Sequence, residues 1–545
     1  MQSESRKSSE SPAAPPRARL RLRLSALLWL SAAAAVAACF VVRNLDMLDT
    51  GLKNIASLAT LGSATILIWA WFVFLSPLGR RVRYAVAGVS IALLAIGAGV
   101  FRFEEVSGDL TPTIAYRWTP EHDQLLQTPV ATAPRAADEP VLSTTSANDY
   151  PQFLGPGRRA TLDGPALATD WEADPPELLW RQPIGAGWSS FAVVGEHAVT
   201  QEQRGDQSLV VCYELRTGDV VWSHADPGRF ESVLGGDGPR ATPTVADGKV
   251  YTLGAAGLLN CLDGATGQVL WSHNVIDETG AEQVAWGRAA SPLVVDRLVL
   301  VPAGGPGKSL VAYNKESGAL VWAEGDDQVS YASPAYAELH GVRQVLVVNQ
   351  NWLVSHRLSD GAELFRHEWP GDSDSNASTS QAVALEGNRV FVSKGYGIGS
   401  MLLQVDRDAE ENFSTEVVWQ DPSLLRTKLT NVVFRDGYVY GLSEGILECV
   451  DLDAGERMWK RGRFGHGQMI LVDDLLLVTS ERGDVSLVEA NPEAYRELTK
   501  FDAIEGKTWN NPALSGNLLL VRNHEEAACY ELPVDEADGD ESGAD

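Results

Sequence analysis

A short phrase recurs five times along this 545-residue chain and constrains its fold more than any other feature. Each copy starts with a small residue, has a Gly six residues on, and ends with a bulky aromatic ten residues on. Four copies carry an acid or an amide two residues after the start, and the remaining copy has Arg357 there. The copies are Cys212–Trp222, Cys261–Trp271, Ala312–Trp322, Ser355–Phe365 and Cys449–Trp459. Internal repetition of this kind predicts one large repeat domain.

Each copy lies inside a longer unit that reads as four short strands. One unit comprises Ala241–Val245, Val250–Leu253, Leu258–Leu262 and Val269–Ser272, with Asp-Gly and Thr-Gly turn signals between them. The closing aromatic residues of successive units stand about 50 residues apart, which is typical of propeller blades. First strands are expected near Ser189, Ala241, Ser291, Ser333, Ser380, Asn431, Gln468 and Asn510. The pattern predicts an all-β, eight-bladed propeller, and seven blades remain open if the fourth or seventh unit is misread.

The two ends of the repeat region complement each other. The last unit ends at Ala528–Leu532 and lacks its aromatic strand, whereas Leu178–Arg181 is an aromatic strand without a unit before it. If Leu178–Arg181 supplies the missing strand, the ring closes and no sheet edge is left open at the seam. We therefore expect Trp180 in the last blade.

The recurring phrase resembles the tryptophan-docking motif of pyrroloquinoline quinone (PQQ) repeat propellers, a family that includes BamB-like proteins and quinoprotein alcohol dehydrogenases. The leader Tyr150–Arg158 is similar to the opening of many secreted or anchored members, and the resemblance covers Asp149–Val534. It implies that each motif Trp packs one blade on the next and has no catalytic role.

Three apolar stretches precede the repeats, and their lengths suit the roughly 17–25 residues of a membrane-spanning helix. They are Leu24–Val42, Ile55–Leu75 and Tyr84–Phe101. Arginines cluster before the first stretch and between the second and third, so both clusters fall on one side if all three span. The positive-inside tendency places that side in the cytoplasm and the propeller in the periplasm of a cell inner membrane. Alternatively, Val36–Cys39 resembles a lipoprotein cleavage box, in which case Cys39 is acylated.

Composition divides the chain into five segments. We expect a basic cytoplasmic terminus at 1–23, the three-helix anchor at 24–101, a tether at 102–176, the propeller at 177–534 and a disordered acidic tail at 535–545. Acidic residues number 72 against 44 Lys and Arg, a formal net charge of −28. Nucleic acid is therefore not an expected partner, because its phosphates would be repelled.

Four of the five cysteines occupy one slot of the repeat: Cys212, Cys261, Cys449 and Cys529. Ala and Ser fill the same slot elsewhere, so a small packing residue is required there. The repeat geometry should hold these slots too far apart for disulfides.

Candidate ligand-binding residues lie where each innermost strand begins, because ligands of such propellers sit over the central channel. They are Arg240, Trp286, Arg288, Lys308, Lys428, Asn431, Gln468, Lys507, Trp509 and Asn510. Bases, amides and indoles on an acidic protein suit an anionic or planar ligand. The alternative is that they pair with nearby acids such as Asp237, Glu444 or Glu505.

Two functions remain in view. The first is a membrane-anchored, non-catalytic module that binds an envelope protein or a small anionic ligand, as the BamB-like resemblance implies. The alternative is a quinoprotein alcohol or sugar dehydrogenase, for which the resemblance implies PQQ and Ca²⁺. The chain has no adjacent Cys-Cys pair, no metal-ligand spacing among its nine His, and no recognisable catalytic motif. The binding module is therefore favoured, and no catalytic or metal residue is assigned.

Overall fold

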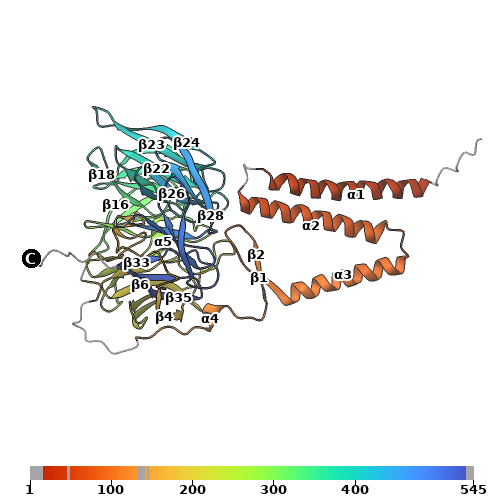
Figure 1. The fold of residues 1–545 in the computed structure, drawn as a ribbon, viewed down its shortest axis with the longest axis horizontal. Helices are drawn as coiled ribbons and strands as arrows, with labels where there is room; N and C mark the ends of the chain where they lie inside the picture. The colour runs from red at the N-terminus through yellow and green to blue at the C-terminus, as the bar shows by residue number, and fades with distance from the viewer. Residues whose placement is uncertain (1–15, 46–48, 132–140, 144–145, 536–545) are drawn as a thin grey trace, which may run out of the picture. The chain divides into compact units, whose positions relative to one another are not determined.

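The computed structural model describes residues 16–45, 49–131, 141–143 and 146–535. They form two compact units, one made of the N-terminal helices with 109–119 and the other of 105–108 with the chain from Pro120 onward (Figure 1). The expected acidic tail at 535–545 and the first part of the basic terminus lie almost wholly outside the described residues.

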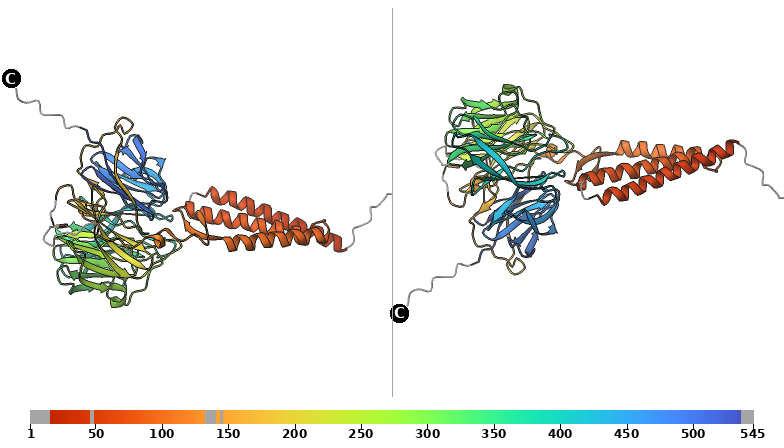
Figure 2. Two further views of the ribbon diagram at one scale, coloured as in Figure 1. Left: turned by 90° about the horizontal axis from the view of Figure 1, so that it is seen from below. Right: turned by 90° about the horizontal axis from the view of Figure 1, so that it is seen from above.

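The first unit contains the three expected helices. They are α1 (Pro16–Arg43), α2 (Thr50–Phe74) and α3 (Arg80–Val100), followed by the hairpin strands β1 (Phe101–Val106) and β2 (Pro112–Tyr116). All three are long and apolar enough to cross a membrane, with mean hydropathies of 2.2, 1.7 and 1.7. The first two lie side by side in both views of Figure 2, and the Trp29 and Trp71 rings meet at 5.3 Å. Asp49 caps α2 by accepting the Leu52 N–H at 2.8 Å.

The second unit is an eight-bladed propeller of four-stranded antiparallel blades, as the repeat predicts. Blades 1 and 2 hold β5 (Ala192–Val194), β6 (His197–Arg204), β7 (Gln207–Glu214), β8 (Val220–Pro227), β9 (Thr244–Ala246), β10 (Lys249–Leu253), β11 (Leu258–Asp263) and β12 (Val269–Asn274). Blades 3 and 4 hold β13 (Leu293–Val295), β14 (Leu298–Pro302), β15 (Leu310–Asn314), β16 (Leu320–Glu324), β17 (Ala335–Leu339), β18 (Val342–Val348), β19 (Trp352–Arg357) and β20 (Glu363–Glu368).

The second half of the ring follows the same plan. Blades 5 and 6 hold β21 (Val383–Leu385), β22 (Arg389–Lys394), β23 (Gly399–Arg407), β24 (Phe413–Asp421), β25 (Val433–Arg435), β26 (Tyr438–Ser443), β27 (Ile446–Asp451) and β28 (Glu456–Arg463). Blades 7 and 8 hold β29 (Gln468–Val472), β30 (Leu475–Thr479), β31 (Asp484–Glu489), β32 (Glu497–Asp502), β33 (Ala513–Ser515), β34 (Leu518–Arg522), β35 (Glu526–Glu531) and β4 (Glu177–Pro183). Short elements outside the blades are α4 (His122–Leu125), η1 (Pro156–Arg158), β3 (Thr161–Leu162) and α5 (Val275–Thr279).

The seam of the ring is closed as expected. β4 pairs with β35 in an antiparallel register that sets Trp180 opposite Cys529. The aromatic strand that precedes blade 1 in the sequence thus completes the last blade and pairs with the edge of β35. A second closure was not expected, because β3 adds to β29 in parallel and makes blade 7 five-stranded.

The recurring phrase joins neighbouring blades. The Trp222 indole donates to the Gly264 carbonyl of the next blade at 2.8 Å, and Trp180 donates to the Leu215 carbonyl at 2.9 Å. Gly267 has a φ of +70°, and a Cβ there would lie 2.5 Å from the Trp222 ring. The Gly of each phrase therefore makes the turn and leaves room for the preceding blade's Trp.

Cysteines fill the packing slot of the third strand in four blades. These four form no disulfide and are fully buried, on β7, β11, β27 and β35. Burial raises the thiol pKa of Cys261, Cys449 and Cys529 to about 12. These thiols are small apolar fillers and not nucleophiles.

The leader closes one end of the central channel. Tyr150 forms a bridge with Val193 near the end of β5, and Arg158 enters the channel, only 2% exposed. Its guanidinium donates to Gln152 Oε1, Thr244 Oγ1 and the carbonyls of Ser291, Pro292 and Pro334. Burial without a carboxylate lowers the Arg158 pKa to about 9. One side chain thus links the innermost segments of three blades.

Candidate functional site

The opposite end of the channel is formed by the eight segments that lead into the first strands of the blades. We call this end the mouth. The channel-lining strands all run in the same direction, so these segments gather at one end, and the sequence-predicted residues lie on or near them. The structure separates those residues into two sides of the mouth, an inner group of amides and two outlying Lys.

The first side of the mouth is built around Lys507, which is covered by the chain's own residues 105–108. The Lys507 ammonium lies 4.9 Å from the Trp188 ring centroid and 4.4 Å from that of Trp509. It forms an ion pair with the Glu105 carboxylate and donates to the Val106 carbonyl at 3.1 Å. The Lys507 ammonium is therefore already bound by a carboxylate, a carbonyl and two aromatic rings of the protein itself.

Glu481 holds the other end of the same segment. One carboxylate oxygen accepts the Gly108 N–H at 2.7 Å and the Trp509 indole N–H at 2.9 Å, and the other accepts the His466 N–H at 3.1 Å. A Cβ on Gly108 would stand 2.1 Å from the His466 ring, so only Gly fits there. Together, Lys507 and Glu481 bind four residues, Glu105–Gly108, which run from the end of β1 into the hairpin turn, by charge and main-chain contacts. We call this the closed side.

The second side of the mouth lies under the loop 228–239, which joins blades 1 and 2. Arg240 stacks 4.5 Å from the Phe230 ring centroid, and its guanidinium donates to loop carbonyls, including that of Gly235 at 3.1 Å. Trp286 stacks on Tyr331 with ring centroids 4.8 Å apart. Desolvation lowers the Arg240 pKa to about 9. We call this the loop side.

Arg288 is the least satisfied cation of the loop side. It is 2% exposed, and Nη2 donates to the Glu282 carbonyl at 2.9 Å, while Nε and Nη1 have no partner among the described residues. The Trp286 indole N–H is also buried without a partner. Burial lowers the Arg288 pKa to about 10. Donors that lack acceptors are therefore concentrated on this side, at a cost in stability.

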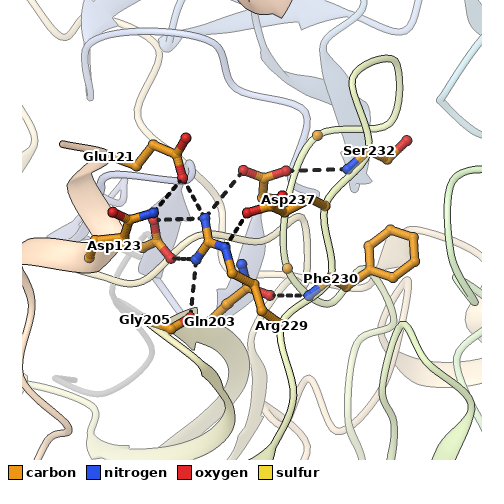
Figure 3. Close-up of polar contacts among 12 residues, drawn as sticks. Glu121, Asp123, Gln203, Gly205, Arg229, Phe230, Ser232 and Asp237 are labelled. Atoms are coloured by element: carbon orange, nitrogen blue, oxygen red, sulfur yellow. Dashed lines mark hydrogen bonds and ion pairs between the residues drawn. The ribbon is translucent and has the colours of Figure 1, made fainter. Parts of the chain in front are cut away.

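Arg229 anchors the loop at its base (Figure 3). Its guanidinium pairs with the carboxylates of Glu121, Asp123, Glu231 and Asp237, of which Glu121 and Glu231 lie at 2.5 Å and Asp237 at 3.7 Å. Asp123 belongs to α4 and is 3% exposed. These acids raise the Arg229 pKa, whereas burial raises that of Asp237. The loop is thereby tied to the chain segment that precedes the propeller.

The predicted amides form a ring inside the mouth and bind the main chain. Gln468 donates to the Leu429 and Trp509 carbonyls at 2.6 and 2.9 Å, and Asn510 donates to the Ser189 carbonyl at 2.8 Å. Asn431 accepts the Gln381 N–H at 3.0 Å. These contacts join neighbouring blades around the channel.

The remaining predicted residues, Lys428 and Lys308, lie apart from both sides. Lys428 is 4% exposed, with its ammonium 4.9 Å from the Tyr396 ring centroid. Lys308 lies on the outer part of blade 3, where it donates to the Glu278 carbonyl of α5 at 2.8 Å. The ten predicted residues therefore do not form one continuous positive funnel.

Sequence reasoning missed Trp188, Glu481 and Arg229, which organise the two sides. Trp188 precedes the first strand of blade 1 in the same way that Trp286 and Trp509 precede theirs, so position in the repeat could have found it. Glu481 lies in the turn between β30 and β31, Arg229 lies in the loop between blades 1 and 2, and no sequence signal marked either.

A family model described as outer membrane protein assembly factor BamB matches residues 166–322 and 206–461, together more than half of the chain. The chain belongs to this family. No curated protein sequence matches the chain.

Solved structures related to this BamB-family chain share its fold at low identity. The quinohemoprotein alcohol dehydrogenase of Comamonas testosteroni is 13% identical, with a TM-score of 0.51 over 73% of this chain and 82% of that one. The quinohemoprotein alcohol dehydrogenase ADHIIG of Pseudomonas putida HK5 is 13% identical, with a TM-score of 0.52 over 75% and 85%. BamB of Moraxella catarrhalis is 14% identical, with a TM-score of 0.45 over 66% and 99%.

A calcium-dependent quinone site needs a cluster of oxygen ligands at the mouth. No group of three His, Cys, Asp or Glu side chains among the described residues is arranged to hold a metal ion. The four propeller cysteines are buried in the blades, far in sequence from one another. The BamB-family fold itself is shared with proteins named as dehydrogenases.

Proposed function

We propose that this BamB-family protein is a membrane-anchored, extracytoplasmic binding module whose propeller mouth docks a protein partner. The observation that carries the proposal is the bound stretch Glu105–Gly108 on the closed side. Lys507 binds an acidic side chain and a carbonyl, and Glu481 accepts a main-chain N–H three residues later, in the hairpin turn. The mouth thus has the chemistry to bind a turn-forming peptide segment that carries an acidic side chain.

The loop side offers the surface for a partner in trans. Val233 and Leu234 at the loop tip are 73% and 46% exposed, beside the partly buried Trp286. An apolar tip next to aromatic and Arg side chains has the composition of a protein-binding hot spot. Of the ten candidate residues, those of the loop side would support this surface, with Arg240 holding the loop.

The three apolar helices support anchoring, and the arginine distribution supports the side. Arg80, Arg81 and Arg83 stand at the start of α3, on the side where the first arginine cluster also falls if all three helices span. We therefore place the propeller in the periplasm of a cell inner membrane. A reporter fused at Gly543 that is active only outside the cytoplasm is the expected result, and a reporter active only inside would overturn this orientation.

A photo-crosslinking amino acid at Val233 in the full-length protein tests the binding role. We expect a discrete protein adduct from Val233, and none from Glu410, an exposed position on the blade 5 hairpin. The adduct should diminish when Trp286 is replaced by Ala. Absence of an adduct at Val233, or equal adducts at both positions, would contradict docking at the mouth.

The quinoprotein alternative is tested with the same preparation. Purified protein is incubated with PQQ and Ca²⁺, and dye reduction is followed with alcohols and sugars. Stoichiometric quinone binding with dye reduction would replace the binding-module proposal by an oxidoreductase. No quinone binding and no dye reduction is the expected result.

A further inference from the structure

A cavity lies between blades 1 and 2, beneath the base of the loop 228–239. It offers about 70 Å³ to the centres of water molecules, and its walls come from β6, β7, β10 and β11 together with Pro227–Phe230 and Gly238–Pro239. At ~10–15 Å³ for each water centre, about five waters fit, which is close to the size of one sugar ring. The cavity shares the loop 228–239 with the loop side of the mouth, but none of the ten predicted residues lines it.

The cavity combines polar hydrogen-bonding groups with an apolar wall. Gln201, Gln203, Ser208 and Thr252 line it, beside the ring of Phe230. The Gln203 Nε2 group is buried without a partner, while its Oε1 accepts the Phe230 N–H at 2.7 Å. The Ser208 and Thr252 hydroxyls make no hydrogen bond to another described residue. Donors and hydroxyls with unused capacity therefore face one enclosed space.

The charged groups at the cavity already have partners within the protein. Asp226 is bonded through both oxygens, to His224 Nε2 at 3.0 Å and to Asn260 Nδ2 at 2.7 Å. The Arg229 guanidinium is surrounded by carboxylates at the loop base (Figure 3). The only guanidinium of the lining is thus already paired with carboxylates, so an anion would meet an excess of negative charge there. A ligand with hydroxyl groups and an apolar face matches what remains.

We propose that this inter-blade cavity binds one uncharged hexose unit. The ring hydroxyls replace water at Gln203 Nε2, Ser208 and Thr252, and the C–H face of the sugar lies against Phe230 and the neighbouring apolar wall. The loop 228–239 forms one side of the cavity, and Arg229 and Arg240 hold that loop in place.

The test uses the full-length protein in lipid nanodiscs, because a sugar-headed detergent would compete. D-glucose, D-galactose and D-mannose are titrated by calorimetry and by saturation-transfer NMR, with D-gluconate and D-glucosamine as charged comparisons. We expect at least one neutral hexose to bind. Thr252→Val and Ser208→Ala should each weaken that binding about three- to tenfold, the value of one hydrogen bond.

Thr479→Val is the matched control, because Thr479 is a buried hydroxyl without a partner in blade 7, away from the cavity. It should leave hexose binding unchanged. The proposal is overturned if no neutral hexose binds, if Thr252→Val and Ser208→Ala leave binding intact, or if gluconate or glucosamine binds more tightly than every neutral hexose. Failure here would leave the crosslinking result at Val233 unaffected, since that experiment reports on the mouth.

Discussion

The closed side and the loop side of the mouth use similar residues to different ends. On the closed side, Lys507 pairs with Glu105 and Glu481 accepts the Gly108 N–H, so both charged groups are bound by a stretch of the same chain. On the loop side, Arg288 and Trp286 keep buried N–H groups without acceptors. Both sides carry a Trp next to a basic residue, so residue type alone does not tell whether the donor groups already have acceptors. Only the neighbours brought by the fold do so.

The loop depends on a concentration of charge that the closed side does not have. Arg229 faces four carboxylates, one of them buried on α4, whereas Lys507 forms its ion pair with one carboxylate. Removal of a buried partner from such a group leaves like charges without compensation. We therefore expect loss of Arg229 to destabilise the protein more than loss of Lys507.

Arg229→Met should have the largest effect. Loss of the guanidinium leaves Asp123, only 3% exposed, without its cation, and we expect destabilisation of about 3 kcal/mol together with release of the loop. Denaturant midpoints and limited proteolysis of the full-length protein measure both. Arg216→Met, which removes an exposed pair with Glu531, should shift the midpoint far less, because solvent screens this pair. Equal effects of the two variants would show that the loop is not anchored by Arg229.

Gly108→Ala should detach the closed side. Its Cβ would overlap the His466 ring, and we expect a cost of about 1–3 kcal/mol that is relieved when Glu105–Gly108 leaves the mouth. Protease cleavage near this segment measures detachment. Gly97→Ala, with no atom within 4 Å of the added Cβ, should not change the cleavage pattern. A variant that remains as resistant as the parent would contradict the docking geometry.

Lys507→Met should have a smaller effect, because Met keeps the apolar contact with both indoles. The lost ion pair and cation–π contacts predict a change of about 1 kcal/mol and a shift in tryptophan emission from Trp188 and Trp509. Lys500→Met, at an exposed position on β32, should leave emission and stability within about 0.5 kcal/mol of the parent. An unchanged emission spectrum would indicate that Lys507 does not lie between these rings.

Asp237→Asn should have the smallest effect, with a distinctive pH dependence. Burial raises the Asp237 pKa above its ordinary value of 3.8, so the ionised form opposes folding at neutral pH and stability returns as pH falls through the raised pKa. The variant should equal or exceed the parent at pH 7 by less than about 0.5 kcal/mol, and this difference should disappear near pH 4.

Asp247→Asn should change stability at neutral pH in the direction opposite to Asp237→Asn. The hydrogen bond from Lys315 holds the Asp247 pKa below 3.8, so its contribution is present above that pH and is lost as pH falls further. This variant should be less stable than the parent at pH 7. Unfolding midpoints measured from pH 4 to 7 compare the two, and a shared sign would contradict the assigned surroundings of Asp237.

Much of the fold could be predicted because the repeat is local. The phrase places a turn Gly and a packing Trp at fixed spacing, and the missing aromatic strand near Cys529 identifies Trp180 as its complement. The site was harder to predict. Position in the repeat located Trp286 and Trp509 correctly at the mouth, but it also suggested Lys308, which lies on the outer part of a blade.

The sequence by itself determined the ring, its closure and three apolar helices, since these follow from periodic patterns and from chain length. Only the tertiary structure decided which mouth residues are already paired. Glu105 and Lys507, or Asp123 and Arg229, meet across more than 100 residues of chain, and nothing in their local sequence specifies the partner. Burial and charge pairing arise where non-repeated segments cross the repeated scaffold, and that is where the structure places the closed side, the loop side and the inter-blade cavity.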